Sequence, residues 1–397
     1  MDLDAIFVGG GVIGLSGAWR AARRGLSVAV VDPAPGHGAS WVAAGMLAPV
    51  TEAHFGEERL VSLLVAGADR WASFAAELEE TTGLDIGYQR CGTAVVALDT
   101  SDRAVIDDLL ELQWSFHLDS VRLSGSQCRD LVPALAPGVR GGAHVPGDHQ
   151  VDNRRLIAAL LRACALSGVD LVASEVVEVT TRVDRSATGV RLIDRSVIEA
   201  STIVLCAGSE TGLLGGVPPD VLPPVRPVKG VVLRLRGSAS VPLVTRTVRG
   251  LVHGRSCYLV PRADGSLVLG ATSEERGFDR TVQAGAVHAL LDDARALIPG
   301  IDELELVECM AGLRPGSPDN GPFVGWTEVP GLAAATGHFR NGILLAPLTA
   351  DALVAMVVGN PVPDPLSGFG LGRVIRGGSG HAASTSARPI STRTPER

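Results

Sequence analysis

Short apolar runs and helical spacings alternate along the chain and predict a mixed α/β protein. Near the N-terminus, residues 5–9 and 27–31 form apolar runs typical of buried strands. Between them, apolar residues recur every three or four positions over residues 11–24, and Gly25 is a natural helix stop. The pattern therefore predicts a strand–helix–strand unit.

The same two patterns continue to about residue 358. Helices are predicted at residues 57–82, 152–168, 280–298 and 342–358. Buried strands are predicted at residues 169–173, 203–208, 305–310 and 332–336. Further β structure with turns is predicted at residues 86–98, 120–145, 176–199 and 229–270.

This order of elements predicts an α/β fold in which a Rossmann-like nucleotide-binding domain of discontinuous segments carries an inserted antiparallel β-sheet domain. The predicted nucleotide-binding domain covers residues 1–85, 143–228 and 310–360. The predicted inserted domain, which would bind the substrate, covers residues 86–142 and 229–309. Residues 361–397 are rich in Gly, Ser, Thr, Pro and Arg and are predicted to be a disordered tail.

Composition and charge narrow the classes of protein. The 397 residues are 46% hydrophobic and 20% charged, which suits a globular protein with a large core. A net charge of −8 without a basic stripe argues against a nucleic-acid partner. We expect no membrane span, because no apolar run reaches about 18 residues. Residues 1–20 lack signal-peptide features, and six scattered cysteines suggest reduced thiols rather than a metal site, so we expect a cytoplasmic protein.

Three glycines at the junction of the first strand and helix predict a site for a dinucleotide. In Gly9-x-Gly11-x-x-Gly14, Gly9 permits a tight turn, Gly11 lets backbone N–H groups approach a pyrophosphate, and Gly14 lets helix and strand pack closely. Asp32 ends the second strand, where its carboxylate can accept hydrogen bonds from ribose hydroxyls. These residues leave open whether the cofactor is NAD or FAD.

Residues beyond this motif carry a resemblance to a known family. Residues 38–49, GASWVAAGMLAP, resemble the small-residue segment that runs under the flavin in D-amino-acid-oxidase-type flavoproteins. GGGVIG (9–14), AAGML (43–47), AGLRPGSPDNGPFVG (311–325) and GHFRNGILLAP (337–347) occur in the family's order, and CYLVPRADGSLVLGAT (257–272) and PVKG (227–230) fit more weakly. From residue 1 to about 358, the chain thus resembles the glycine oxidase branch of the D-amino acid oxidase family.

The resemblance implies an activity and a cofactor. It implies FAD-dependent oxidation of a small amino acid, foremost glycine, to its imine and then to glyoxylate and ammonia. O₂ would be reduced to H₂O₂, and the imine would supply the thiazole ring in thiamine biosynthesis. FAD should be bound non-covalently, because the GLRP segment contains no cysteine. Thiazole synthase and further copies of this chain are the implied partners.

Four side chains are implied near the substrate. Arg314 follows the predicted strand 305–310 and precedes a proline, which holds its backbone, and its planar guanidinium matches a carboxylate. By the resemblance, Arg314 and Tyr258 bind the amino acid carboxylate, Arg340 lies near the substrate, and Met46 lies beside the flavin.

The residues implied to line the FAD come from five segments. Besides the three glycines, they are Val12, Ile13, Asp32, Pro33, Ala39, Ser40, Ala44, Gly45, Met46, Val176, His338, Phe339, Arg340, Asn341, Gly342, Ile343 and Leu344. The N-terminus of the last predicted helix would face the flavin and favour negative charge there.

Two departures from the family pattern leave the identity of the amine substrate undetermined. Trp41 and Val42 replace smaller residues, and Ser273 stands where glycine oxidases can carry a methionine. A sarcosine, D-proline or other D-amino acid oxidase or dehydrogenase on the same fold is one alternative. A non-catalytic flavin-binding protein is another.

Overall fold

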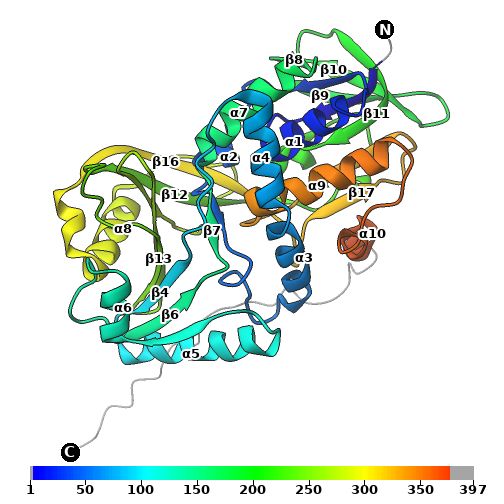
Figure 1. The fold of residues 1–397 in the computed structure, drawn as a ribbon. Helices are drawn as coiled ribbons and strands as arrows, with labels where there is room; N and C mark the ends of the chain where they lie inside the picture. Colours follow the sequence, from blue (N-terminus) through cyan, green and yellow to red (C-terminus); the bar gives the residue numbers. More distant parts are fainter. Residues whose placement is uncertain (1–2, 376–397) are drawn as a thin grey trace, which may run out of the picture.

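The computed structural model describes residues 3–375, which form two large sheets with helices packed around them (Figure 1). The first sheet has the strand order β17-β18-β11-β1-β2-β8. Its strands are β1 (Leu3–Val8), β2 (Val28–Val31), β8 (Asp170–Val172), β11 (Val197–Leu205), β17 (Phe323–Trp326) and β18 (Leu332–Thr336). Neighbours in this order pair in parallel, apart from β17 with β18. Strands β9 (Val176–Thr181) and β10 (Ala187–Leu192) extend the sheet from β11 by antiparallel pairing.

Three helices cover the first sheet and position the predicted dinucleotide site. They are α1 (Val12–Ala22), α7 (Asn153–Leu166) and α9 (Gly342–Val357). Phe7, Leu15 and Trp19 are fully buried in the core that these helices share with β1 and β2. The predicted strand–helix–strand unit is present, with parallel pairing from Ala5 with Val28 to Val8 with Val31.

The second sheet has the strand order β16-β12-β15-β14-β13-β4-β6-β5. Its strands are β4 (Thr93–Ala97), β5 (Val121–Ser124), β6 (Gly141–Val145), β12 (Arg226–Arg236), β13 (Thr247–Val252), β14 (Arg255–Pro261), β15 (Ser266–Gly270) and β16 (Glu305–Gly316). Pairing is antiparallel apart from β4 with β13. Helices α5 (Thr100–Ser115), α6 (Gly125–Leu131) and α8 (Ala284–Leu297) pack on this sheet.

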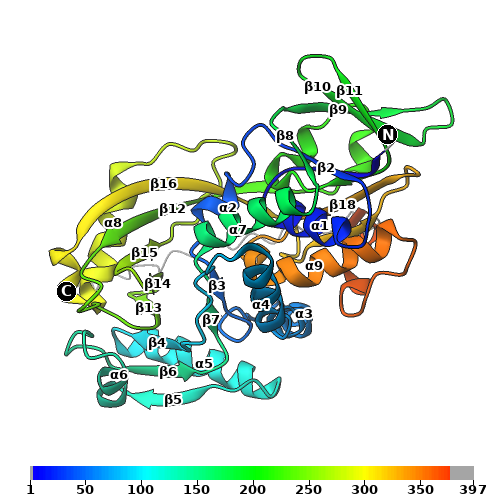
Figure 2. The same cartoon turned by 45° about the horizontal axis from the view of Figure 1, so that its top comes forward.

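Strands β12 and β16 are the longest of this sheet, and they extend from it toward the first sheet (Figure 2). They pair from Arg226 with Gly316 to Arg236 with Glu305. Three predicted domain boundaries therefore cut through strands of the second sheet, namely β6 at residue 143, β12 at 229 and β16 at 310. Arg314 lies inside β16 rather than after a strand, because β12 continues to pair with β16 as far as Gly316.

Two further expectations differ from the structure, and one helix was not expected. The predicted helix 57–82 is two helices, α3 (Glu58–Ala68) and α4 (Trp71–Thr82), and α5 was not predicted. Residues 361–375 do not form a disordered tail: they include η4 (Leu366–Phe369) and α10 (Gly372–Ile375). This segment folds because Leu366, Phe369 and Leu371 are buried against the first sheet and its helices. Residues 376–397, on which the remainder of that prediction falls, lie outside the described residues.

All six cysteines are free thiols. Within residues 3–375, no helix has the length and apolar character needed to cross a membrane. In the same described range, no group of three or more His, Cys, Asp and Glu side chains could hold a metal ion.

Candidate functional site

The turn between β1 and α1 uses its glycines in two different ways. Gly9 has φ +109°, and a Cβ there would lie 2.5 Å from the carbonyl oxygen of Cys206. A Cβ at Gly14 would lie 2.0 Å from the carbonyl oxygen of Gly9. The fold itself therefore requires these two glycines. A Cβ at Gly11 would approach only Ser40 Oγ, at 3.3 Å, so the bare backbone of Gly11 leaves space beside the helix N-terminus.

Asp32 and Ser40 surround the same helix N-terminus. Asp32 accepts hydrogen bonds from the backbone N–H groups of Gly10 and Ala34, at 2.7 Å each, and each carboxylate oxygen keeps a lone pair for a further donor. Ser40 Oγ accepts from the Val12 N–H at 3.0 Å and keeps its own proton to donate. Gly11 caps α1 without a side chain, so the helix end can receive an anion. These residues fit the diphosphate and ribose of a dinucleotide.

The segment predicted to face the flavin packs against the second sheet. Gly45 has φ +75°, and a Cβ there would lie 2.0 Å from the carbonyl oxygen of Val151. Ala39 begins α2 (Ala39–Val42), which lies between α7 and β16 (Figure 2). Ala44 and Met46 belong to one apolar cluster with Tyr258. The segment predicted to face the flavin and Tyr258, which is predicted to bind the substrate, thus come together here.

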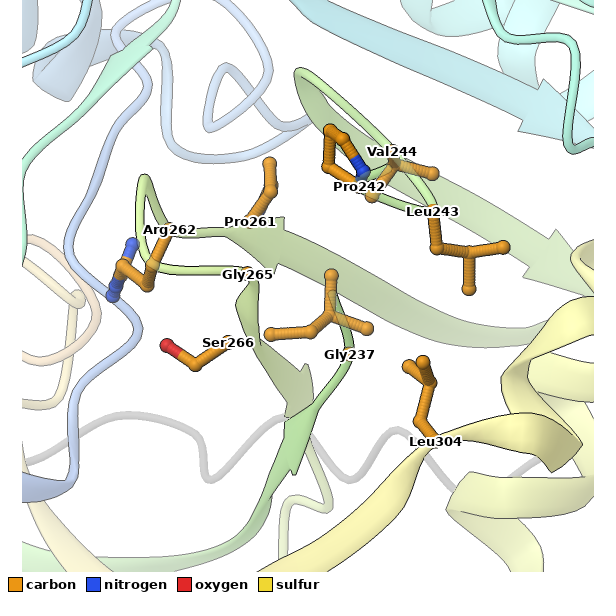
Figure 3. A pocket seen from close by; sticks show the side chains of 10 residues that line it. Gly237, Pro242, Leu243, Val244, Pro261, Arg262, Gly265, Ser266 and Leu304 are labelled. Atoms are coloured by element: carbon orange, nitrogen blue, oxygen red, sulfur yellow. The ribbon is translucent and has the colours of Figure 1, made fainter. Parts of the chain in front are cut away.

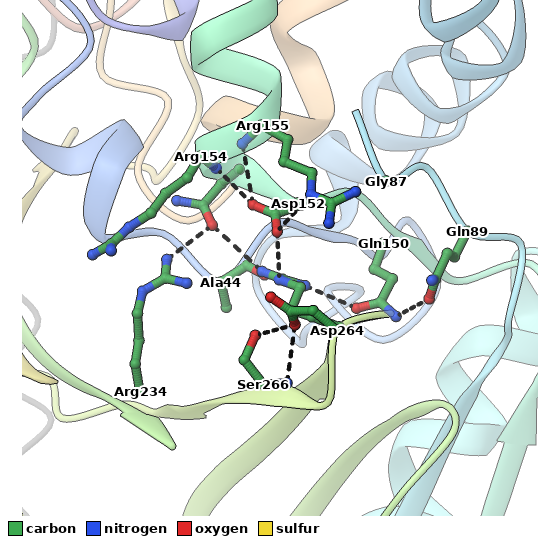
Figure 4. Close-up of polar contacts among 12 residues, drawn as sticks. Ala44, Gly87, Gln89, Gln150, Asp152, Arg154, Arg155, Arg234, Asp264 and Ser266 are labelled. Atoms are coloured by element: carbon green, nitrogen blue, oxygen red, sulfur yellow. Dashed lines mark hydrogen bonds and ion pairs between the residues drawn. The ribbon is translucent and has the colours of Figure 1, made fainter. Parts of the chain in front are cut away.

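Arg262 ties this segment to the second sheet. It is 7% exposed and donates to the carbonyl oxygen of Ala44 at 2.6 Å and to Gln150 Oε1 at 3.0 Å. Its Nε lies 3.6 Å from an Asp152 carboxylate oxygen, and Asp152 also caps α7 through the N–H groups of Arg154 and Arg155. Ala44, Gln150 and Asp152 lie close together in this network (Figure 4). The backbone at Ala44 is therefore held in place by Arg262, which is itself held by Gln150 and Asp152.

Arg314 and Tyr258 each lie against a glycine whose missing side chain makes room for them. The Arg314 guanidinium donates to the carbonyl oxygens of Thr272 at 3.1 Å and Lys229 at 3.5 Å. A Cβ at Gly230 would lie 2.3 Å from this guanidinium, and a Cβ at Gly270 would lie 2.4 Å from the Tyr258 hydroxyl. Burial raises the pKa of Tyr258 while Arg314 acts in the opposite sense, so the phenol is neutral at physiological pH. Glycines inside predicted strands are the sequence signal for such a close approach.

The turn before α9 places the predicted 338–342 segment beside the end of β16. The Phe339 N–H donates to the carbonyl oxygen of Pro315 at 3.0 Å, next to Arg314. His338 is 2% exposed and contacts Thr349 Oγ1 at 3.1 Å, and burial lowers the pKa of His338 to about 3, so its ring is neutral. Asn341 precedes α9 without a side-chain cap, which leaves N–H groups at the helix N-terminus for a ligand.

The remaining predicted lining residues occupy less informative positions. Val12, Ile13, Ile343 and Leu344 are buried in the core around α1 and α9. Val176 begins β9 and packs in a separate core with Val31. Pro33 is exposed after β2.

Arg340 is held by two carboxylates that the sequence analysis missed. Its Nε donates to Glu52 at 2.7 Å and its terminal nitrogen to Glu57 at 2.8 Å. Glu52 also accepts from Arg249 at 2.8 Å. Burial raises the pKa of Glu52, but Arg249 and Arg340 outweigh it and hold this pKa well below its usual range. The position of Glu52, an acidic residue in the largely apolar run after AAGML, was the feature of the sequence that could have indicated a role in the site.

A small pocket in the second sheet is not part of this site. It is lined by residues of β14, β15 and neighbouring turns, including Arg262, Gly237 and Leu304 (Figure 3). Its cavity volume is about 10 Å³. That is about the space of one water molecule and too small for an amino acid.

Comparisons with known proteins identify the family of this chain. The family model described as DAO, FAD dependent oxidoreductase, matches residues 4–356. The glycine oxidase of Geobacillus kaustophilus is 35% identical over 381 residues, covering 94% of this chain and 97% of the relative. The crystal structure of glycine oxidase from that organism has a TM-score of 0.86 and 32% identity over 94% of this chain and 99% of that chain.

Two further relatives carry different names. The bifunctional protein ThiO/ThiG of Nostoc sp. is 33% identical over 367 residues, which are 92% of this chain and 54% of the relative. The chain therefore spans about half the length of this bifunctional relative. The crystal structure of iminodiacetate oxidase from Chelativorans sp. has a TM-score of 0.81 and 27% identity, covering 92% of this chain and 98% of that chain. By its family match and these relatives, the chain belongs to the DAO family of FAD-dependent oxidoreductases.

Proposed function

We propose that this protein oxidises a small amino acid, foremost glycine, to its imine with bound FAD, and that O₂ is the electron acceptor. One observation carries the proposal. Of the arginines at positions 249, 314 and 340, only Arg314 has no carboxylate at ion-pair distance among residues 3–375. A guanidinium held against carbonyl oxygens beside a neutral tyrosine is suited to receive the carboxylate of a substrate.

Arg314 and Tyr258 would orient the substrate together. The guanidinium can pair with both carboxylate oxygens, and the neutral phenol can donate a further hydrogen bond. The apolar cluster around Ala44, Met46 and Val232 would exclude water from the other side of the substrate. Fixing the carboxylate directs the α-carbon of the amino acid.

The β1–α1 glycine turn, Asp32, Ser40 and the segment around Ala44 would hold FAD, which would supply the two-electron chemistry that links amine oxidation to the reduction of O₂ to H₂O₂. The imine then takes up water and yields glyoxylate and ammonia. Glu52 is a poor proton acceptor because it pairs with two arginines and its pKa is low. We therefore expect the substrate amine to lose its proton on binding, and not to Glu52.

We further propose that the imine feeds a thiazole synthase in the cytoplasm and that the chain forms homo-oligomers. The bifunctional ThiO/ThiG relative supports the first point, since the chain matches only about half of it. A sarcosine, D-proline or D-amino acid oxidase or dehydrogenase remains the alternative on the same fold.

Oxygen consumption separates these activities. Purified protein supplied with glycine should consume O₂ and release one H₂O₂ per O₂ consumed, and peroxidase-coupled detection measures this ratio. Sarcosine, D-proline and D-alanine, each tested alone, rank the side-chain preference. Turnover with a quinone analogue but none with O₂ would contradict the oxidase assignment and favour a dehydrogenase.

A further inference from the structure

Arg249 belongs to the same face of the second sheet as Tyr258. The two residues are direct cross-strand partners in the β13–β14 pair, so their side chains lie side by side. Arg249 donates to Thr51 Oγ1 and to Glu52 Oε1, at 2.8 Å each. Two arginines, Arg249 and Arg314, therefore adjoin the tyrosine that we assign to substrate binding.

Hydrogen bonds to Asp148 hold the loop that carries Glu52. Asp148 is fully buried and accepts from the Val50 N–H at 2.9 Å, from the Thr51 N–H at 3.1 Å and from Thr51 Oγ1 at 2.5 Å. Glu52 itself is 6% exposed. Its carboxylate thus has a defined position between its two arginine partners.

The charges in this cluster balance. Glu52 uses one carboxylate oxygen for Arg249 and the other for Arg340, and Glu57 takes a second nitrogen of Arg340. His54 Nε2 lies 3.9 Å from Glu52, and burial lowers the pKa of His54, so its ring adds no full charge at neutral pH. Two carboxylates therefore neutralise two guanidiniums, whereas Arg314 has no carboxylate partner within the part of the chain that the structure describes.

We propose that Glu52 is a specificity-determining residue that restricts the site to amines with a single carboxylate, because it occupies Arg249 and Arg340. This inference rests on the proposed function. A substrate carboxylate pairs with Arg314, whereas a second carboxylate finds both other arginines occupied and meets the negative charge of Glu52. Glycine, sarcosine and D-alanine fit this rule, and iminodiacetate and D-aspartate are excluded by it.

Wild-type holoenzyme already tests the rule. Ligands that perturb the flavin absorbance give dissociation constants without turnover, and acetate, propionate, malonate and succinate form matched pairs with one and two carboxylates. We expect each dicarboxylate to bind at least about tenfold more weakly than its monocarboxylate partner. The kcat/KM for iminodiacetate should likewise fall below that for sarcosine. Equal affinity for the two classes in wild-type protein would overturn the inference.

The variant Glu52→Gln keeps the side-chain volume and removes the charge. We expect malonate or succinate affinity to rise about tenfold or more, because the second carboxylate gains a charge-assisted bond to a freed arginine, while acetate affinity changes less than threefold. Adding Arg249→Met to this variant should abolish the gain. Glu57→Gln is the control, since it leaves the pair between Glu52 and Arg249 intact and should not acquire dicarboxylate binding.

The outcomes separate this inference from the proposed function. Suppose that wild-type protein binds acetate and oxidises glycine but that Glu52→Gln gains no dicarboxylate affinity. This result refutes the role of Glu52 and leaves the proposed function standing. Wild-type protein that holds FAD but neither binds acetate nor oxidises glycine refutes the proposed function.

Discussion

Replacing Arg314 by alanine should raise the KM for glycine about 100- to 1,000-fold while FAD remains bound. The substrate carboxylate would lose its cationic partner in a partly enclosed site, and truncating one side of such a pair costs about 3–4 kcal/mol. Among residues 3–375, Arg314 forms no ion pair with a carboxylate and donates to the carbonyl oxygens of Lys229 and Thr272, so its loss leaves no buried carboxylate unpaired. Steady-state kinetics over a wide glycine range, with the flavin spectrum recorded for each preparation, measure the effect.

Arg314→Lys is the matched control for this variant. Lysine keeps the positive charge but cannot form the planar two-point contact, so its KM should lie between those of wild type and Arg314→Ala. An Arg314→Ala enzyme with unchanged KM and a normal flavin spectrum would show that another group binds the carboxylate.

Replacing Gly11 by alanine should weaken FAD binding about 10- to 100-fold and leave the folded protein intact. The added methyl group meets only Ser40 Oγ, at 3.3 Å, but it occupies the space beside the N-terminus of α1 where a diphosphate would approach. Losing one or two charge-assisted hydrogen bonds to backbone N–H groups accounts for this magnitude. Titrating the apoprotein with FAD, followed by flavin fluorescence quenching, gives the dissociation constants.

Two other glycine variants serve as controls for Gly11→Ala. Gly285→Ala lies in α8, where its Cβ would meet no atom within 4 Å, and should leave FAD affinity unchanged. Gly14→Ala should instead destabilise the apoprotein itself, because its Cβ would lie 2.0 Å from the carbonyl oxygen of Gly9. Wild-type FAD affinity in Gly11→Ala would place the diphosphate elsewhere.

The sequence could predict the dinucleotide end of the site because its determinants are local. Gly9, Gly11, Gly14 and Asp32 lie within one strand–helix–strand unit, and their spacing alone specifies the turn. The close approach of Arg314 to Gly230 also has a local signal, a glycine inside an apolar strand pattern, although we did not predict it. The assignment of Arg314 and Tyr258 to the substrate needed the family resemblance as well.

Features that depend on distant contacts escaped prediction. The cluster of Glu52, Arg249 and Arg340 joins residues about 200 and 290 positions apart, and no spacing within one segment encodes it. Strand β16 continues through Arg314 only because β12 pairs with it. Residues 361–375 fold because three apolar side chains reach existing cores, although their surroundings are rich in glycine and polar residues.

Anaerobic mixing of the purified protein with glycine tests the proposed chemistry most directly. If FAD lies over the N-terminus of α1 and Arg314 directs glycine to it, the yellow preparation should lose its visible flavin absorbance and regain it when O₂ is admitted. A preparation that binds FAD but keeps its full absorbance with glycine, sarcosine and D-alanine, or one that takes up no FAD at all, would contradict it.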